Sequence, residues 1–183
     1  MLNQSANYLV GGLVPEPMGN DHPNIVPYGI FPTADGQIFL GATTELQFAR
    51  LARMLEVPEL AQMAAYSTNA ARVANRVALV EALSAHTRRR ATGAWLEAAA
   101  DQDVLAAAVN NVAQALADPQ VTATGLVVEL DTSDGPLRLV RSPILVDGQR
   151  LPVRQPPPAL GEHTADVLAG LPGPEHGSPG PSR

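Results

Sequence analysis

Cysteine and lysine are both missing from this 183-residue sequence, and aromatic residues make up only 4% of it. Without cysteine the chain can form no disulfide, hold no metal through thiolates and use no thiolate nucleophile. All 12 basic residues are arginines, and against 18 acidic residues they leave a formal net charge of −6. An acidic chain without a basic stripe is not typical of proteins that bind nucleic acids, so we expect no nucleic-acid partner.

The apolar residues are mostly small, and they never form a long run. Alanine, with 29 residues, supplies much of the 45% apolar share, and it favours helices but buries little area. We therefore expect a thin core that depends on a second domain or a partner chain. No apolar run approaches the ~18 residues of a membrane span, and the first residues do not resemble a signal peptide. The sequence predicts a cytoplasmic protein with no membrane partner.

Motifs for the common catalytic and cofactor sites are also absent. The sequence has no Gly-x-Gly-x-x-Gly, P-loop, His-Glu-x-x-His or Gly-x-Ser-x-Gly motif. The four histidines, at positions 22, 86, 163 and 176, do not have the spacing of metal ligands, so no metal site is predicted. One basic run, Arg88-Arg89-Arg90, is interpreted as the cationic end of a helix, with a phosphate-binding cluster as the alternative.

Periodicity and turn residues predict a helix end, a hairpin and then several helices. The first ten residues have the pattern of a helix that Gly11-Gly12 terminates. Two β-rich runs, 25–31 and 37–42, flank a turn that contains Asp35-Gly36 and predict a hairpin. Helices are expected from Thr44 with a Gln47 capping box, from Pro58, and over 71–90 with Thr68 or Asn69 as cap. Two more are expected, one capped by Thr92 and one over 111–117. The helix from Thr44 should bury Leu46, Phe48, Leu51, Ala52 and Leu55.

The last third of the chain changes in character. A second hairpin is expected from runs 126–130 and 137–140, with Ser133-Asp134-Gly135 in its turn. Eight of the 17 prolines lie between residues 151 and 183, where only 162–168 is predicted to be helical and the end is expected to be disordered. This order predicts an α+β fold: a small antiparallel sheet of hairpins with packed helices, then an extended Pro-rich C-terminal tail.

One loop combines stiff backbone positions with polar side chains. It reads Gly19-Asn20-Asp21-His22-Pro23-Asn24-Ile25-Val26-Pro27-Tyr28-Gly29. Glycine reaches backbone angles that other residues avoid and proline restricts the chain, while rigid polar loops beside a hairpin often form binding sites. The candidate substrate-loop residues are Gly19, Asn20, His22, Pro23, Asn24 and Tyr28. The alternative is a plain connector between a helix and a hairpin.

The loop and its continuation closely resemble a segment of the class III CoA-transferases, also called the CaiB/BaiF family. The shared pattern is Gly-Asn-x-His-Pro-Asn-x-x-Pro-Tyr followed by Asp35-Gly36. Four further segments occur in the family's order: 68–76 (Thr-Asn-Ala-Ala-Arg-Val-Ala-Asn-Arg), Trp95, Asp118-Pro119-Gln120-Val121, and 156–164 (Pro-Pro-Pro-Ala-Leu-Gly-Glu-His-Thr). The resemblance runs from Met1 to about Leu171, and it is the order of the five segments that makes it specific.

The resemblance implies a domain organisation and an assembly. Proteins of this family are interlocked dimers whose subunits have a large Rossmann-like domain and a small domain that closes over the active centre. On that pattern residues 1–18 are the end of the inter-domain helix and a linker, and 19–125 are the small domain. Residues 126–171 are the second hairpin and a C-terminal return segment, and 172–183 are a disordered tail. The implied partner is a second copy or a chain that carries the large domain.

The resemblance also implies an activity. Such enzymes move CoA from an acyl-CoA to a carboxylic acid through an aspartate that attacks the thioester and forms a mixed anhydride. Coenzyme A thioester is a substrate, and no permanently bound cofactor is implied. The aspartate belongs to the large domain, so no residue of this chain is assigned a catalytic role. The 19–29 loop corresponds to a mobile loop that covers reactive intermediates and excludes water.

The sequence leaves more than one function open, and it does not identify the acyl group or the acid. The first hypothesis is a fragment of a CoA-transferase that is inactive alone. The second is a non-catalytic dimerising or binding remnant of the family. The third is an unrelated α+β ligand-binding domain. The run 103–110 departs from the family's Gly/Pro-containing turn, as Ala42-Thr43-Thr44-Glu45 departs from its Val-Gly-Asn-Asp pattern.

Overall fold

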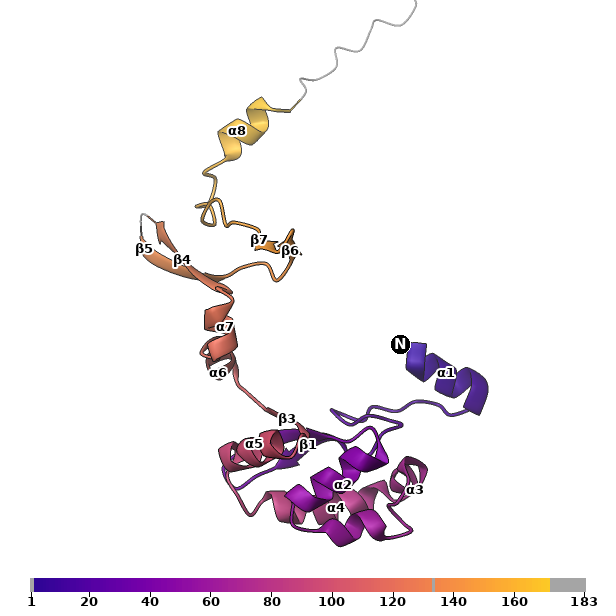
Figure 1. Cartoon of the computed structure of the whole chain (residues 1–183). Coiled ribbons are helices and arrows are strands. Elements are labelled where there is room, and N and C mark those ends of the chain that lie inside the picture. Colours follow the sequence, from indigo (N-terminus) through magenta and orange to yellow (C-terminus); the bar gives the residue numbers. More distant parts are fainter. Residues whose placement is uncertain (1, 133, 172–183) are drawn as a thin grey trace, which may run out of the picture. The chain divides into compact units, whose positions relative to one another are not determined.

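The protein consists of two compact units, residues 1–110 and 111–183, in a computed structural model that describes residues 2–132 and 134–171. Both units combine helices with small antiparallel sheets (Figure 1), which confirms the predicted α+β class. The predicted disordered end, 172–183, and Ser133 of the second predicted turn lie outside the described residues. No helix in the described ranges is both long and apolar enough to cross a bilayer.

The sheet of the first unit has three antiparallel strands in the order β1-β2-β3. Strands β1 (Tyr28–Pro32) and β2 (Gln37–Gly41) are the predicted hairpin, and Ile30 lies opposite Phe39. Strand β3 (Leu105–Ala108) pairs with β2 and was not predicted. An alanine-rich run favours helix by local propensity, so its extended conformation depends on a partner strand far away in the sequence.

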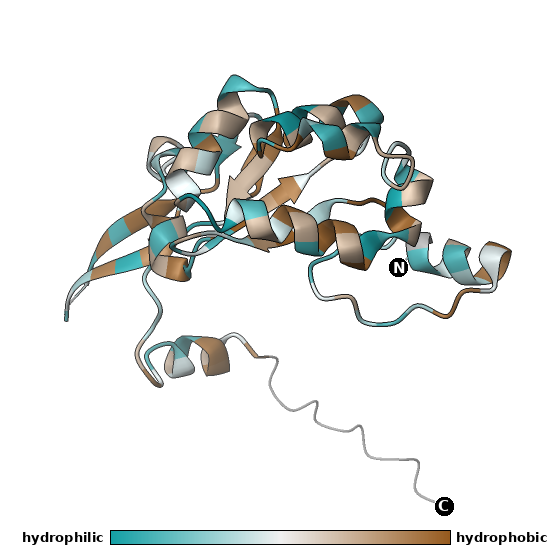
Figure 2. Ribbon diagram, turned by 90° about the horizontal axis from the view of Figure 1, so that it is seen from below, coloured by the Kyte–Doolittle hydropathy of each residue, from teal (hydrophilic) through white to brown (hydrophobic). Residues whose placement is uncertain are grey.

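Helices α2 (Glu45–Met54), α4 (Arg76–Thr87) and α5 (Thr92–Asp101) pack around this sheet. Helix α4 contacts β1, α5 contacts β3, and α2 contacts α5 and the short 3-10 helix η1 (Pro58–Gln62). Figure 2 shows the strands of this sheet in the brown of apolar residues, with helices alongside. The largest fully buried apolar side chains all belong to this unit: Trp95, Phe31, Phe48, Ile38, Leu40, Leu51, Leu55, Leu79, Leu83 and Val26.

Helix α2 begins as predicted and buries the predicted face except for Leu46, with Met54 buried in addition. The Thr44 side chain accepts a hydrogen bond from the Gln47 backbone N–H at 3.2 Å, and the Gln47 side chain accepts one from the Thr44 N–H, which confirms the capping box. Phe48 and Leu51 are buried, whereas Leu46 is 63% exposed. The prediction for Leu46 was wrong because the first turn of the helix turns this side chain toward solvent.

The predicted long helix over 71–90 is two helices, α3 (Asn69–Ala74) and α4, which meet at Asn75. The Asn75 side-chain amide donates to the Ala71 carbonyl oxygen at 2.9 Å and to the Ala65 carbonyl oxygen at 3.3 Å. Asparagine offers the backbone an alternative partner of this kind and so interrupts helices. Thr68, not Asn69, caps α3, because its hydroxyl accepts from the Ala71 N–H.

Helix α5 is capped by a residue of the β1–β2 turn. Thr92 is the first residue of the helix rather than its cap, and Ala91 makes no side-chain cap bond. The Asp35 carboxylate accepts from the Thr92 backbone N–H at 2.7 Å and from its hydroxyl at 3.0 Å. These two bonds, with a smaller contribution from the Thr33 hydroxyl, hold the pKa of Asp35 below its ordinary value. The predicted turn residue is therefore also a helix cap.

The arginine run 88–90 follows directly after α4, as its interpretation as a helix end predicts. Arg90 forms an ion pair with Glu56, and its guanidinium lies 4.9 Å from the centre of the Trp95 ring. Because Arg90 is engaged by a carboxylate and an aromatic ring, the run does not present three unpaired guanidinium groups to a phosphate.

Helix α1 (Leu2–Gly11) ends at the predicted glycine pair, where Gly12 has φ 69°. Such a left-handed residue commonly follows a helix and is most easily supplied by glycine. The apolar side chains of α1 and of the linker after it are exposed, among them Leu9 (79%), Val10 (89%) and Val14 (73%).

Among its described residues, 111–132 and 134–171, the second unit has two hairpins and three short helices. Strands β4 (Val127–Thr132) and β5 (Gly135–Val140) form the predicted hairpin, and β6 (Leu145–Val146) pairs with β7 (Gln149–Arg150) in one that was not predicted. The helices are α6 (Val112–Leu116), α7 (Pro119–Ala123) and α8 (Thr164–Ala169). No side chain is buried among residues 111–132 and 134–171. Within these residues the second unit has no hydrophobic core of its own.

Candidate functional site

The 19–29 loop is held to the first unit by three polar side chains of α3 and α4. They are Asn69, Arg72 and Arg76, and their contacts to the loop are all to backbone N–H or C=O groups. These residues belong to the 68–76 segment, so the structure brings together two of the segments that carry the family resemblance. The sequence analysis considered Asn69 only as a possible helix cap, and it gave Arg72 and Arg76 no contact with the loop.

Arg76 binds the first half of the loop. One terminal nitrogen of its guanidinium donates to the carbonyl oxygens of His22 and Pro23, each at 2.8 Å. Arg76 is the first residue of α4, and it reaches the loop because Asn75 ends α3 and redirects the chain.

Asn69 binds the second half of the loop with both ends of its amide. Its nitrogen donates to the Asn24 carbonyl oxygen at 2.7 Å, and its oxygen accepts from the Val26 N–H at 3.1 Å. The Asn69 backbone N–H donates to the Glu45 carboxylate at 3.2 Å. Bonds from Glu45's own backbone N–H and from that of Asn69 hold the pKa of Glu45 below its ordinary value.

Arg72 is the most deeply placed charged residue of the site, with 0% of its surface exposed. Its guanidinium donates to the Val26 carbonyl oxygen at 2.6 Å and to the Tyr66 carbonyl oxygen at 3.0 Å, and it lies 4.5 Å from the centre of the Phe48 ring. Burial lowers the pKa of Arg72, and the negative charge of Glu45 opposes this shift. A buried cation is tolerated where hydrogen bonds and an aromatic face replace water.

Internal contacts hold the loop against the sheet. The His22 N–H donates to the Tyr28 carbonyl oxygen at 3.0 Å, and the Asn24 N–H donates to His22 Nδ1 at 3.1 Å. The His22 ring meets the Tyr28 ring edge-on at 5.4 Å, and Tyr28 meets Phe39 of β2 in the same way at 4.9 Å. The loop is therefore braced on both sides.

Two glycines make room for this arrangement. A Cβ on Gly29 would overlap the Asp21 carboxylate, and a Cβ on Gly41 would come within 3.1 Å of the Tyr28 ring. At Gly41 the Tyr28 ring, which is packed against Phe39, leaves little room for a Cβ, whereas at Gly29 the exposed Asp21 side chain can turn away. Gly19, in contrast, has φ 61° and opens the loop in the left-handed region.

The candidate loop residues thus fall into two groups. His22, Pro23, Asn24 and Tyr28 lie in the braced part of the loop, while Gly19 and Asn20 form an exposed turn ahead of it. Asp21, the carboxylate of the loop, is exposed, and within the described part of the chain its side chain accepts no hydrogen bond. The loop therefore offers hydrogen-bond donors on a firmly held backbone, but it does not present an activated carboxylate nucleophile.

Helix α1 contacts the loop through amides. The Asn24 side chain donates to the Asn7 side-chain oxygen at 3.1 Å, and Asn7 in turn donates to the Gln4 side-chain oxygen at 3.1 Å. A small cavity of about 210 Å³ lies here, lined by residues of α1, of the linker and of the loop, Pro23 and Asn24 among them. The loop is therefore linked to both the helix before it and the helices after it.

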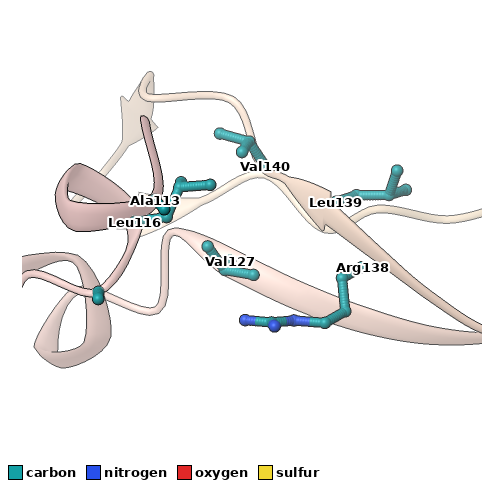
Figure 3. Close-up of a pocket in the computed structure, with 7 residues that line it drawn as sticks. Ala113, Leu116, Val127, Arg138, Leu139 and Val140 are labelled. Carbon is teal, nitrogen blue, oxygen red and sulfur yellow. The ribbon is translucent and has the colours of Figure 1, made fainter. Parts of the chain in front are cut away.

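The second unit has a separate open cavity of about 380 Å³ against the β4–β5 hairpin. Figure 3 shows Ala113 and Leu116 of α6 beside Val127 of β4, with Arg138 of β5 at the edge. Leu139 and Val140 of β5 are also part of the lining. The lining is aliphatic apart from Arg138 and includes no nucleophile or acid–base pair, so it is not a candidate active site.

The fold and the site define a small α+β domain that holds a polar loop by the loop's backbone groups. The sequence model of CoA-transferase family III matches residues 1–164. The chain belongs to this family, which confirms the resemblance noted from the sequence.

Known relatives match almost the whole chain. Succinate–glutarate CoA-transferase of Agrobacterium fabrum is 41% identical over 172 residues, which are 93% of this chain and 43% of that protein. Human succinyl-CoA:glutarate CoA-transferase is 35% identical over 165 residues, or 90% of this chain and 38% of that protein. A CaiB/BaiF family protein from Brucella suis has a similar structure, with a TM-score of 0.74 and 37% identity over 91% of this chain and 43% of that one. The chain thus spans less than half the length of these relatives.

Proposed function

We propose that this chain forms the small-domain part of a CoA-transferase that moves CoA between an acyl-CoA and a carboxylic acid, and that it is inactive alone. The observation that carries this proposal is the site itself: the 19–29 loop is locked to the 68–76 segment, yet it presents no activated carboxylate. Such a site suits a cover for an intermediate formed on a nucleophile elsewhere. Closing a site against water protects thioesters and anhydrides from hydrolysis.

We propose dicarboxylic acids of the size of glutarate and succinate as the substrate class, with succinyl-CoA as the donor. Two relatives support this, because both are named for a transfer between succinate and glutarate. Coenzyme A thioester enters as a substrate and is not a resident cofactor.

We further propose that the working assembly contains a large domain and a second copy of the same subunit. The exposed apolar side chains of α1 and the linker support this, since Leu9, Val10, Leu13 and Val14 are each at least two-thirds exposed. Contiguous apolar surface of this kind typically marks an interface.

A chimera tests the proposal. In the Agrobacterium relative, this chain would replace the 172 residues that it matches, and CoA transfer from succinyl-CoA to glutarate would be followed by liquid chromatography. We expect transfer by the chimera and none by the purified chain alone. A folded chimera without transfer would contradict the proposed function, and transfer by the isolated chain would contradict its dependence on a large domain.

A further inference from the structure

One nitrogen of the His22 ring already takes part in a hydrogen bond within the loop. The Asn24 backbone N–H, which can only donate, lies 3.1 Å from His22 Nδ1. Nδ1 must therefore be the acceptor, and in the neutral ring the proton then resides on Nε2. Within the described part of the chain Nε2 forms no hydrogen bond, and the side chain is half-buried.

Every other group of His22 is occupied. Its N–H donates to the Tyr28 carbonyl oxygen at 3.0 Å, its C=O accepts from Arg76 at 2.8 Å, and its ring is packed edge-on against Tyr28. The next residue, Pro23, stiffens the chain and also accepts from Arg76. All other polar groups of His22 have hydrogen-bond partners, so Nε2–H is a hydrogen-bond donor held in a fixed direction.

We propose that His22 donates a hydrogen bond through Nε2 to an oxygen of the acyl substrate, and that Arg76 is the positioning residue that sets this donor. The inference rests on the proposed function. The oxygen is either the carboxylate of the acid or the carbonyl of the thioester, both of which accept from a neutral imidazole N–H. In this role Arg76 acts on the loop rather than on the substrate, through the terminal nitrogen that binds the carbonyl oxygens of His22 and Pro23.

The first experiment uses the chain alone and measures the tautomer. The ¹⁵N chemical shifts of the imidazoles would be recorded by NMR at about pH 8.5, where unperturbed histidines are neutral, with His22→Gln used to assign the signal. We expect His22 in the Nε2–H form, a mixture of tautomers in Arg76→Met, and no change in Arg89→Met, which removes an arginine just beyond the other end of α4. An Nδ1–H tautomer in the unsubstituted chain, or an unchanged His22 signal in Arg76→Met, would overturn the inference.

The second experiment measures transfer in the chimera described above. Glutamine carries an N–H near the place of Nε2 and asparagine near that of Nδ1, so the two variants separate the nitrogens. We expect His22→Asn to lower kcat/KM about 10- to 100-fold, the effect of one hydrogen bond to a charged or reacting oxygen, and His22→Gln to retain most of it. A rise in KM for the acid identifies the carboxylate as the acceptor, and a fall in kcat identifies the thioester carbonyl.

The outcomes separate this inference from the proposed function. If the unsubstituted chimera folds and transfers no CoA, both fail. If it transfers CoA but His22→Asn equals the unsubstituted protein, or His22→Gln is no better than His22→Asn, only the role of His22 fails. If His22 behaves as expected but Arg76→Met keeps full kcat/KM, only the positioning role of Arg76 fails.

Discussion

Replacing Arg72 with methionine removes a buried cation and keeps an apolar side chain of similar length. Two hydrogen bonds disappear, to the carbonyl oxygens of Val26 and Tyr66, together with the contact to the Phe48 ring. Hydrogen bonds to charged groups contribute about 1.5–3 kcal/mol each, and the two carbonyl groups remain buried without these donors. Part of this loss is offset, because the variant no longer pays the free-energy cost of removing a charged group from water on folding. We expect the free energy of unfolding to fall by about 3–5 kcal/mol, a large share of the roughly 5–15 kcal/mol of a typical domain.

Urea unfolding monitored by tryptophan fluorescence measures this change, because Trp95 is the single tryptophan and is buried in the first unit. Arg50→Met is the matched control. Arg50 pairs with Asp103, whose side chain is 89% exposed, and exposed pairs contribute about 0.2–1 kcal/mol. If Arg72→Met loses no more stability than Arg50→Met, the reasoning that Arg72 anchors the loop to the core is refuted.

Two further substitutions test the close approach at the loop and the helix cap. Gly41→Ala should lower the free energy of unfolding by about 1–3 kcal/mol, because its Cβ would lie 2.9 Å from the Leu105 side chain and 3.1 Å from the Tyr28 ring, which is packed against Phe39. In Gly93→Ala, where no atom lies within 4 Å of the new Cβ, urea unfolding should show no loss. The pKa of Asp35 is lower in the folded chain than its ordinary value of 3.8, so its stabilising effect is complete above that value and disappears as the pH falls through the folded pKa. Asp35→Asn should therefore lower stability at pH 7 and flatten its decline below about pH 4, and an unchanged acid limb would contradict a role for the Thr92 bonds.

The structure shows how the loop is held in place. The side chains of Asn24 and Tyr28 contact helix α1 and strand β2, and the loop backbone is bound by Asn69, Arg72 and Arg76. Because the contacts of these three residues are to main-chain groups, loop side chains can change without loss of this anchoring.

Much of the local structure was determined by the sequence itself. The capping box of α2, the glycine end of α1, and the two main hairpins follow from short-range rules, because each depends on residues within a few positions of one another. The family followed from ordered motifs, and the loop was singled out by its glycine, prolines and polar tips.

Tertiary structure alone decided the contacts that make the site. Strand β3 is extended because β2 pairs with it, and α5 is capped by Asp35 from a distant turn. Arg76 and Asn69 reach the loop only once the helices are packed. Each of these contacts joins residues far apart in the chain, where neither propensity nor periodicity carries information about distance in space. The sequence pointed to the 19–29 loop and to the 68–76 segment, and only the packing of the helices determines which of their residues are in contact.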